Sequence, residues 1–141
     1  MATKKFIYIA GPMSQGDYIQ NLRRGMDAWR ELLAAGCTPF CPHLSAFLYL
    51  VYQEEHTYAQ WLSYDFQWLS KCDALLRLPG PSYGADQEVA FAQAHAIPVY
   101  HSIPELLQAI RTVEEGSDDG TRVTEVDPAG PVAQDQADRS A

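Results

Sequence analysis

The sequence has few of the features that mark several large classes of protein. Its three cysteines, Cys37, Cys41 and Cys72, are too few for a disulfide scaffold and cannot all pair with one another. Cys37, Cys41 and His43 match no common zinc spacing, so we predict structural thiols and no metal site. No stretch is long and apolar enough to span a bilayer, and the first apolar run leads into a turn instead of a cleavage site. We therefore expect a soluble, cytoplasmic protein with no membrane partner.

An excess of positive charge is also missing. The 141-residue chain has a net charge of −8, and residues 114–141, with eight acidic and two basic side chains, contribute −6 of it. Residues 1–113 are therefore nearly neutral, which argues against a nucleic-acid partner but leaves room for a small anionic ligand. The tail is rich in Gly, Asp, Pro and Gln and has little to bury. We predict one domain over 1–113 and an acidic, disordered tail over 114–141.

What the sequence does contain is an alternation of short apolar runs and amphipathic segments. Strands are expected at 4–10, 37–42, 73–78 and 97–101, and helices at 18–35, 57–71, 82–96 and 102–115. This alternation predicts an α/β fold, a flavodoxin-like or Rossmann-like three-layer sandwich with a parallel sheet of about four to five strands. Right-handed crossovers give the strand order 2-1-3-4. Residues 44–52 are apolar and aromatic without periodicity and receive no assignment.

Individual residues place some element ends. Thr57, Asp86 and Ser102 are candidate N-caps, and Gly36 is a candidate C-terminal stop for the first helix. Pro39 has no backbone N–H, so it should lie near the start of its strand or on an edge strand.

Candidate chemistry gathers where strands end. Ligands of open α/β sheets bind beyond the carboxyl ends of the strands, and two loops of small residues, 11–17 and 79–88, should lie there. Both lead into helices, whose amide groups suit a phosphate or a carboxylate. We predict Glu88 in the first turn of its helix, where the helix dipole favours the ionised form that a carboxylate nucleophile requires. The alternative, on position alone, is an ordinary Glu that stabilises a helix N-terminus.

Three further side chains are candidates, each with an ordinary alternative. Asp73 begins the third strand, where a carboxylate is often merely exposed. Asp65 lies on the preceding helix and would otherwise belong to a solvated face. Tyr8, at the centre of the first strand, would otherwise serve core packing.

Three segments together resemble the nucleoside 2-deoxyribosyltransferase superfamily, which includes the 2′-deoxynucleoside 5′-phosphate N-hydrolases. They are IYIAGPMSQGD (7–17), WLSYDFQWLSKCDALLRLPG (61–80) and PSYGADQEVAFAQAHAIPVY (81–100). The likeness covers most of residues 5–110 and keeps the order and spacing of the segments, whereas the tail has no counterpart. It implies an enzyme that cleaves N-glycosidic bonds, and a homodimer or larger homo-oligomer whose pockets are completed by a neighbouring subunit.

The resemblance also implies a role for each candidate. Glu88, at the end of the Gly84-x-x-x-Glu motif, would be the nucleophile that forms a glycosyl–enzyme ester. Tyr8 would orient that carboxylate by a hydrogen bond. Asp73 would handle the nucleobase and supply a proton to the leaving group, and Asp65 would lie near the sugar. A carboxylate on one side of an oxocarbenium-like transition state and an acid on the other is the logic of retaining glycoside hydrolysis.

Ser82 bears on the choice of substrate. Transferases of the superfamily often carry an aspartate six residues before the nucleophile, whereas the nucleotide hydrolases carry a serine, as this chain does. A hydroxyl tolerates a 5′-phosphate that a carboxylate would repel. Gly11, Pro12 and Ser14 in the first loop are further candidate contacts. Asp86 departs from the small residue common at its position, and its charge would weaken the phosphate interpretation if it faced the pocket.

The leading hypothesis is an N-glycosidase that acts on a (deoxy)nucleoside 5′-monophosphate. The alternatives are a deoxyribosyltransferase that exchanges bases between nucleosides and a non-catalytic nucleotide-binding module. A generic flavodoxin-like domain ranks lower, because the first loop lacks the Ser/Thr-rich phosphate loop expected for flavin mononucleotide. With no Walker P-loop and no dinucleotide fingerprint, we expect no cofactor. Aromatic side chains between Phe47 and Trp61, among them Tyr49, Tyr52 and Tyr58 together with His56, are candidates for stacking on a nucleobase.

Overall fold

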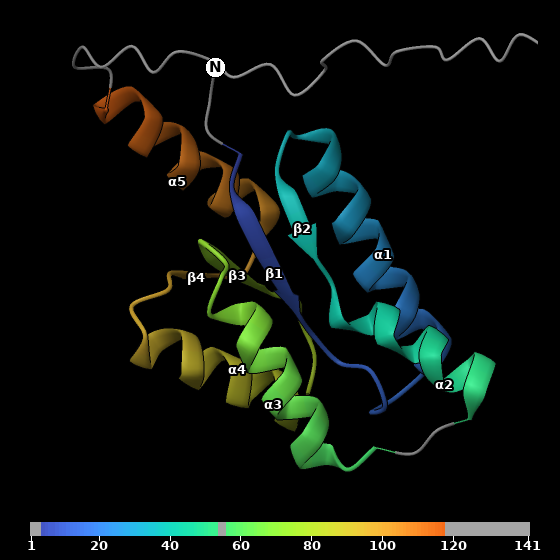
Figure 1. Ribbon diagram of the computed structural model, residues 1–141. Helices are drawn as coiled ribbons and strands as arrows, with labels where there is room; N and C mark the ends of the chain where they lie inside the picture. The colour runs from blue at the N-terminus through green and yellow to red at the C-terminus, as the bar shows by residue number, and fades with distance from the viewer. Residues whose placement is uncertain (1–3, 54–55, 118–141) are drawn as a thin grey trace, which may run out of the picture.

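A parallel sheet of four strands lies between two layers of helices in the computed structural model, which describes residues 4–53 and 56–117 (Figure 1). The strands are β1 (Phe6–Ala10), β2 (Thr38–Phe40), β3 (Ala74–Arg77) and β4 (Val99–Tyr100). The helices are α1 (Tyr18–Ala34), the 3-10 helix η1 (Pro42–Ser45), α2 (Ala46–Tyr52), α3 (Tyr58–Leu69), α4 (Tyr83–Ala94) and α5 (Ile103–Gly116). The predicted three-layer α/β class is confirmed. Most of the predicted tail, residues 118–141, lies outside the described residues, and the predicted boundary after residue 113 falls inside α5.

The strand order is β2-β1-β3-β4, as the right-handed crossovers predict. Tyr8 of β1 lies opposite Phe40 of β2 and Leu75 of β3, and Leu75 in turn lies opposite Val99 of β4. Because all the strands are parallel, their carboxyl ends share one edge of the sheet. The loops after β1 and β3, both predicted to bind ligand, therefore leave the sheet side by side.

The two sides of each strand bury different layers. Successive side chains point to opposite faces of a sheet. Ile7 and Ile9 of β1 pack toward α1 and α5, in a cluster that includes Leu32 and Leu106. Tyr8 and Ala10 point the other way, into a cluster with residues of α3 and α4. One five-residue strand thus supplies both halves of the core.

The helix ends follow the predicted capping rules at most positions. Thr57 and Ser102 cap α3 and α5 through their side-chain oxygens, as predicted, and Gly36 adopts a φ of +88° just after α1. The prediction for Asp86 is wrong. Ser82 caps α4 instead, and its Oγ accepts a hydrogen bond from the Ala85 amide at 3.1 Å. Serine and aspartate are equally good N-caps, so composition alone did not separate the two positions.

Pro39 lies on an edge strand, as predicted. The Thr38 amide donates to the Lys5 carbonyl at 2.8 Å, toward β1. Since successive amides of a strand point to opposite sides, the proline nitrogen faces away from the sheet, where no hydrogen bond is lost.

Residues 44–52, which had no assignment, form the end of η1 and the short helix α2. The sequence of α2, AFLYLVY, is apolar on every side, so no helical stripe could be read from it. None of its residues is buried. This exposed apolar helix stands beside the carboxyl edge of the sheet (Figure 1).

Candidate active site

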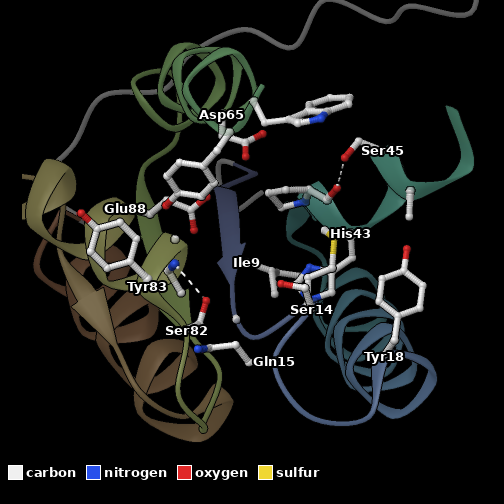
Figure 2. A pocket seen from close by; sticks show the side chains of 18 of the residues that line it. Ile9, Ser14, Gln15, Tyr18, His43, Ser45, Asp65, Ser82, Tyr83 and Glu88 are labelled. Carbon is white, nitrogen blue, oxygen red and sulfur yellow. Dashed lines mark hydrogen bonds between the residues drawn. The ribbon is translucent and has the colours of Figure 1, made fainter. Parts of the chain in front are cut away.

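A cavity of about 600 Å³ opens at the carboxyl edge of the sheet. Its walls come from the loop after β1, from η1 and α2, from α3, and from the first turns of α4 (Figure 2). The volume lies within the range of pockets that bind small molecules. The residues that directly follow β1 and β3 approach so closely that a Cβ on Gly11 would lie 2.9 Å from the Leu78 Cβ, which explains the glycine.

Glu88 lines this cavity, and Tyr8 contacts Glu88 from the core without lining the cavity itself. Glu88 points inward from α4 and is only 6% exposed, and Tyr8 rises from β1 and is fully buried. The Tyr8 hydroxyl donates a hydrogen bond to Glu88 Oε1 at 2.6 Å, the contact that the resemblance to the superfamily implied. Burial, and next the charge of Glu88, raise the pKa of Tyr8 far above its ordinary value, so the phenol keeps its proton and remains a donor.

The ionisation of Glu88 differs from the prediction. Because α4 begins at Tyr83, Glu88 lies in the second turn and not in the first, where the dipole and the free amides act. Burial is the largest influence and raises the pKa of the Glu88 carboxyl to about 8. The hydrogen bond from Tyr8 and the charge of Arg77 lower that pKa, and the charge of Asp65 raises it. Desolvation therefore outweighs the helix end, and Glu88 is largely protonated at neutral pH.

Asp65 brings a second carboxyl group to the same cavity. It projects from α3, and burial raises its pKa to about 7 (Figure 2). Its Oδ1 atom is buried, and no donor in the described part of the chain reaches it. A neutral carboxyl with an unused oxygen can donate a proton to a ligand, and a second acid at partial protonation is what leaving-group catalysis needs.

Asp73 does not reach the cavity. It directly precedes β3, at the amino edge of the sheet, and its Oδ2 accepts a hydrogen bond from the Phe6 amide at 2.8 Å. The cavity lies at the other end of the strands. Asp73 therefore joins β1 to the start of β3, and the prediction that it lies at the site is corrected. Asp65, and not Asp73, is the carboxyl group that lines the cavity together with Glu88.

Most of the predicted substrate-binding residues are brought together. Gly11, Ser14, Ser82 and Gly84 all line the cavity, whereas Pro12 does not. Ser82 accepts a hydrogen bond from an amide of α4, and its hydroxyl proton remains available to donate to an anion. Each loop thus contributes one serine to the cavity, as Figure 2 shows.

His43 is a lining residue that the sequence analysis considered only as a metal ligand. Its Nε2 lies 2.8 Å from the Pro12 carbonyl oxygen, and because a carbonyl only accepts, Nε2 carries the proton. Burial lowers its pKa, so the ring is neutral and Nδ1 is an acceptor. No partner for Nδ1 lies within residues 4–53 and 56–117. The sequence did contain a signal for this residue, because His43 directly follows the predicted strand 37–42 at the edge of the sheet where ligands bind.

Several aromatic rings border the cavity. Tyr49, His56 and Tyr58, three of the stacking candidates, line it, whereas Tyr52 does not. Tyr83 was not predicted. Its ring centroid lies 6.0 Å from that of Tyr58.

Other predictions concern features away from the cavity. Cys37 and Cys41 are buried thiols within the apolar core, and no group of three potential metal ligands occurs in the described ranges. Within the same ranges, no helix is long and apolar enough to cross a membrane.

The fold and the cavity define a three-layer α/β protein with a buried carboxyl group, Glu88, and a half-buried one, Asp65, at the carboxyl edge of a parallel sheet. The chain belongs to the family described as Domain of unknown function (DUF7768), whose model matches residues 5–102. This match begins just before β1 and ends just before α5, so it contains every residue placed at the cavity. A comparison with curated proteins finds none that matches the chain.

Proposed function

We propose that this protein cleaves the N-glycosidic bond of a (deoxy)nucleoside 5′-monophosphate through a covalent glycosyl–Glu88 intermediate. The observation that carries the proposal is the buried 2.6 Å hydrogen bond from Tyr8 to Glu88, a residue that lines the same cavity as Asp65. The likeness of three sequence segments to the nucleoside 2-deoxyribosyltransferase superfamily supports it, with Asp65 in place of Asp73 as the acid.

In the first step, an ionised Glu88 oxygen attacks the anomeric carbon while the bond from that carbon to the base nitrogen breaks. The bonding electrons leave with the base, which takes the proton of Asp65. In the second step, water attacks the same carbon, Asp65 takes the water proton, and Glu88 departs as a carboxylate. Two displacements of this kind retain the configuration of the sugar.

The reactive state has a single proton on the two acids, and that proton is on Asp65. Glu88 must lose its proton, with a pKa of about 8, and Asp65 must keep its own, with a pKa of about 7. The charge of Asp65 acts on Glu88, so the two carboxyl groups lose their protons in two coupled steps. The dependence of kcat/KM on pH should be bell-shaped, with its maximum between the two pKa values.

The 5′-monophosphate is favoured by the two serines on the loops and by the place of Asp86. The Asp86 side chain is paired with Arg77 outside the cavity, so the acid that would have weakened the phosphate interpretation does not face it. Neutral hydroxyls and the first amides of α4 are suitable partners for a phosphate.

The test is to incubate the protein with the deoxynucleoside and ribonucleoside monophosphates and with the matching nucleosides, each with and without a second base. Free base released from a monophosphate without an acceptor supports hydrolysis. Product formed only with an acceptor base supports transfer, and binding without turnover supports a binding module. Intact mass after reaction with a slow 2-fluoro substrate should show a sugar adduct, lost in Glu88→Gln. Absence of both base release and adduct would overturn the proposal.

The predicted homodimer or larger homo-oligomer stays a prediction, and the exposed apolar helix α2 supports it. Large apolar surfaces of this kind are typical of interaction sites. Light scattering should give a mass above that of one chain for the wild type, and Leu50→Glu, which places a charge on α2, should lower it. Val113→Glu, at an equally exposed apolar residue on α5, is the matched control. A monomeric wild type would contradict the prediction.

A further inference from the structure

Arg77, the last residue of β3, is more buried than arginines usually are. Its side chain is 10% exposed, and its guanidinium makes three hydrogen bonds. Nη1 donates to the Leu78 carbonyl, and Nη2 donates to the Gly80 carbonyl at 3.0 Å and to Asp86 Oδ1 at 2.9 Å. Arg77 therefore ties the turn that follows β3 to the first turn of α4.

This contact lies on the far side of the turn from the candidate active site. Arg77, Asp86 and His101, with residues 78–80, line a separate cavity of about 320 Å³. No residue lines both cavities. Residues two apart on an α-helix point about 200° apart, which is why Glu88 faces the larger cavity and Asp86 the smaller one.

The charge of Asp86 matters for the binding of an anion at the start of α4. Asp86 is the acidic residue in the first turn of α4, the helix whose positive end lies beside Ser82. A free carboxylate there would oppose a second anion at the same helix end. Its side chain is 68% exposed, and among the contacts of the described residues its charge is paired only with Arg77. The helix position of Asp86 turns it away from the larger cavity, and Arg77 cancels its charge.

We propose that Arg77 is a positioning residue for the activity proposed above: by neutralising Asp86 and holding the 78–80 turn behind α4, it keeps the Ser82 end of the cavity able to accept a substrate that carries a 5′-phosphate. The inference rests on the proposed function. Arg77 touches neither sugar nor base in this arrangement, and it acts through Asp86 and the turn. The charge of Arg77 also lowers the pKa of Glu88. This effect should change the reaction rates of the monophosphate and the nucleoside equally.

The test compares kcat/KM for a nucleoside 5′-monophosphate with that for the corresponding nucleoside in four proteins: wild type, Arg77→Gln, Asp86→Asn and the double variant. We expect Arg77→Gln to lower kcat/KM for the monophosphate about tenfold more than kcat/KM for the nucleoside, because only the former meets an uncompensated carboxylate. Asp86→Asn should not weaken the monophosphate preference. The double variant should recover most of the preference that the single Arg77 variant loses.

Two control variants distinguish the position of Arg77 from the mere loss of a positive charge and from a loss of folding. Arg111→Gln removes the same charge from exposed α5 and should leave the preference unchanged. Arg77→Lys keeps the charge but cannot span all three acceptors, so it should fall between wild type and Arg77→Gln. If Arg77→Gln does not fold by circular dichroism, the Lys variant and Asp86→Asn carry the test. Equal losses on the two substrates, no rescue by Asp86→Asn, or a monophosphate loss in Asp86→Asn alone would each overturn the inference.

This failure is distinguishable from failure of the proposed function. If the wild type releases no base from any substrate, the proposed function fails, and calorimetric binding of the monophosphate and the nucleoside then replaces kcat/KM. A wild type that binds neither would overturn both proposals. A wild type that works but has a preference independent of Arg77 would overturn the inference alone.

Discussion

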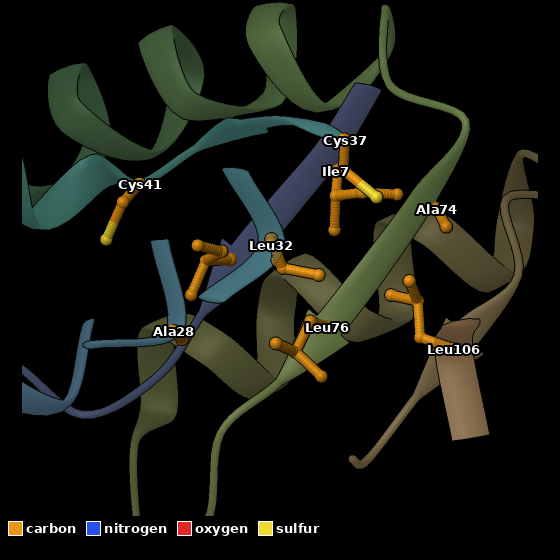
Figure 3. Packing of buried hydrophobic residues seen from close by; sticks show 9 residues of the cluster. Ile7, Ala28, Leu32, Cys37, Cys41, Ala74, Leu76 and Leu106 are labelled. Carbon is orange, nitrogen blue, oxygen red and sulfur yellow. The ribbon is translucent and has the colours of Figure 1, made fainter. Parts of the chain in front are cut away.

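The two faces of the sheet differ in what they bury. Toward α1 and α5 the cluster of buried hydrophobic residues consists of apolar side chains and two thiols, shown in Figure 3, and the polar side chains buried on or beside α1, Asn21 and His43, carry no carboxyl group. Toward α3 and α4 the corresponding cluster contains Tyr8, with the carboxyl of Glu88 against it. Since alternate residues of β1 and β3 serve the two faces, one short strand both stabilises the fold and positions a buried acid.

The first test of this difference between the faces removes the carboxyl group of Glu88 from the face toward α3 and α4. Glu88→Gln keeps the size of the side chain and an acceptor for Tyr8, but it cannot form a glycosyl ester. We expect kcat to fall at least about a thousandfold, as for other nucleophile losses. The measurement is base release by chromatography. A decrease of less than tenfold would remove Glu88 from the proposed role.

The second test compares Leu76 with Leu75, neighbours on β3 that are equally buried but face opposite layers. Each substitution by alanine should lower the free energy of unfolding by about 3 kcal/mol, because each leaves a cavity. Only Leu75→Ala should also lower kcat, since Leu75 lies opposite Tyr8. Urea unfolding and steady-state kinetics measure the two effects. An equal decrease of kcat in both variants would show that the faces are not functionally distinct.

The third test compares Asp65, at the carboxyl edge of the sheet, with Asp73, at the amino edge. Asp65→Asn should lower kcat about a hundredfold, a value typical of a lost general acid. Asp73→Asn is the matched control, because Asp73 lies at the amino edge and only accepts a backbone hydrogen bond, which the Asn oxygen can still accept. Its kcat should change less than about threefold, with a small decrease in melting temperature. The reverse ranking would return the acid role to Asp73.

The smallest expected effect is on stability. The folded-state pKa of Glu88 is about 8, above its ordinary value of 4.5, so the folded protein binds this proton more tightly than the unfolded chain does. The resulting stabilisation of the fold is fully present below the ordinary pKa and is lost as pH rises through the folded-state pKa. Between pH 6 and 7, wild type should lose about 1 kcal/mol per pH unit that Glu88→Gln does not lose. Urea unfolding of both proteins at several pH values checks the difference. Parallel curves would mean that Glu88 is not desolvated as described.

Periodicity and spacing predicted the layers and the strand order, whereas the Tyr8–Glu88 contact was implied only by the resemblance of three segments to a known superfamily. The sequence did not separate Asp65 from Asp73, since a carboxylate at the start of a strand and one on a helix look equally polar until burial is known. It also missed α2, whose uniform apolarity leaves no stripe, and it misjudged Glu88 because a helix start at Ser82 instead of Asp86 moves the acid by one turn. Burial and exact helix starts are therefore what the structure added.

The proline in β2 has a consequence for how copies of the chain can meet. With its nitrogen turned outward, β2 offers an incomplete row of hydrogen-bond donors on its free side, and β4 at the other border of the sheet is only two residues long. Such borders make poor templates for a strand from another molecule. Fibre-like growth through the sheet is therefore disfavoured, and any assembly is directed toward contacts between helices.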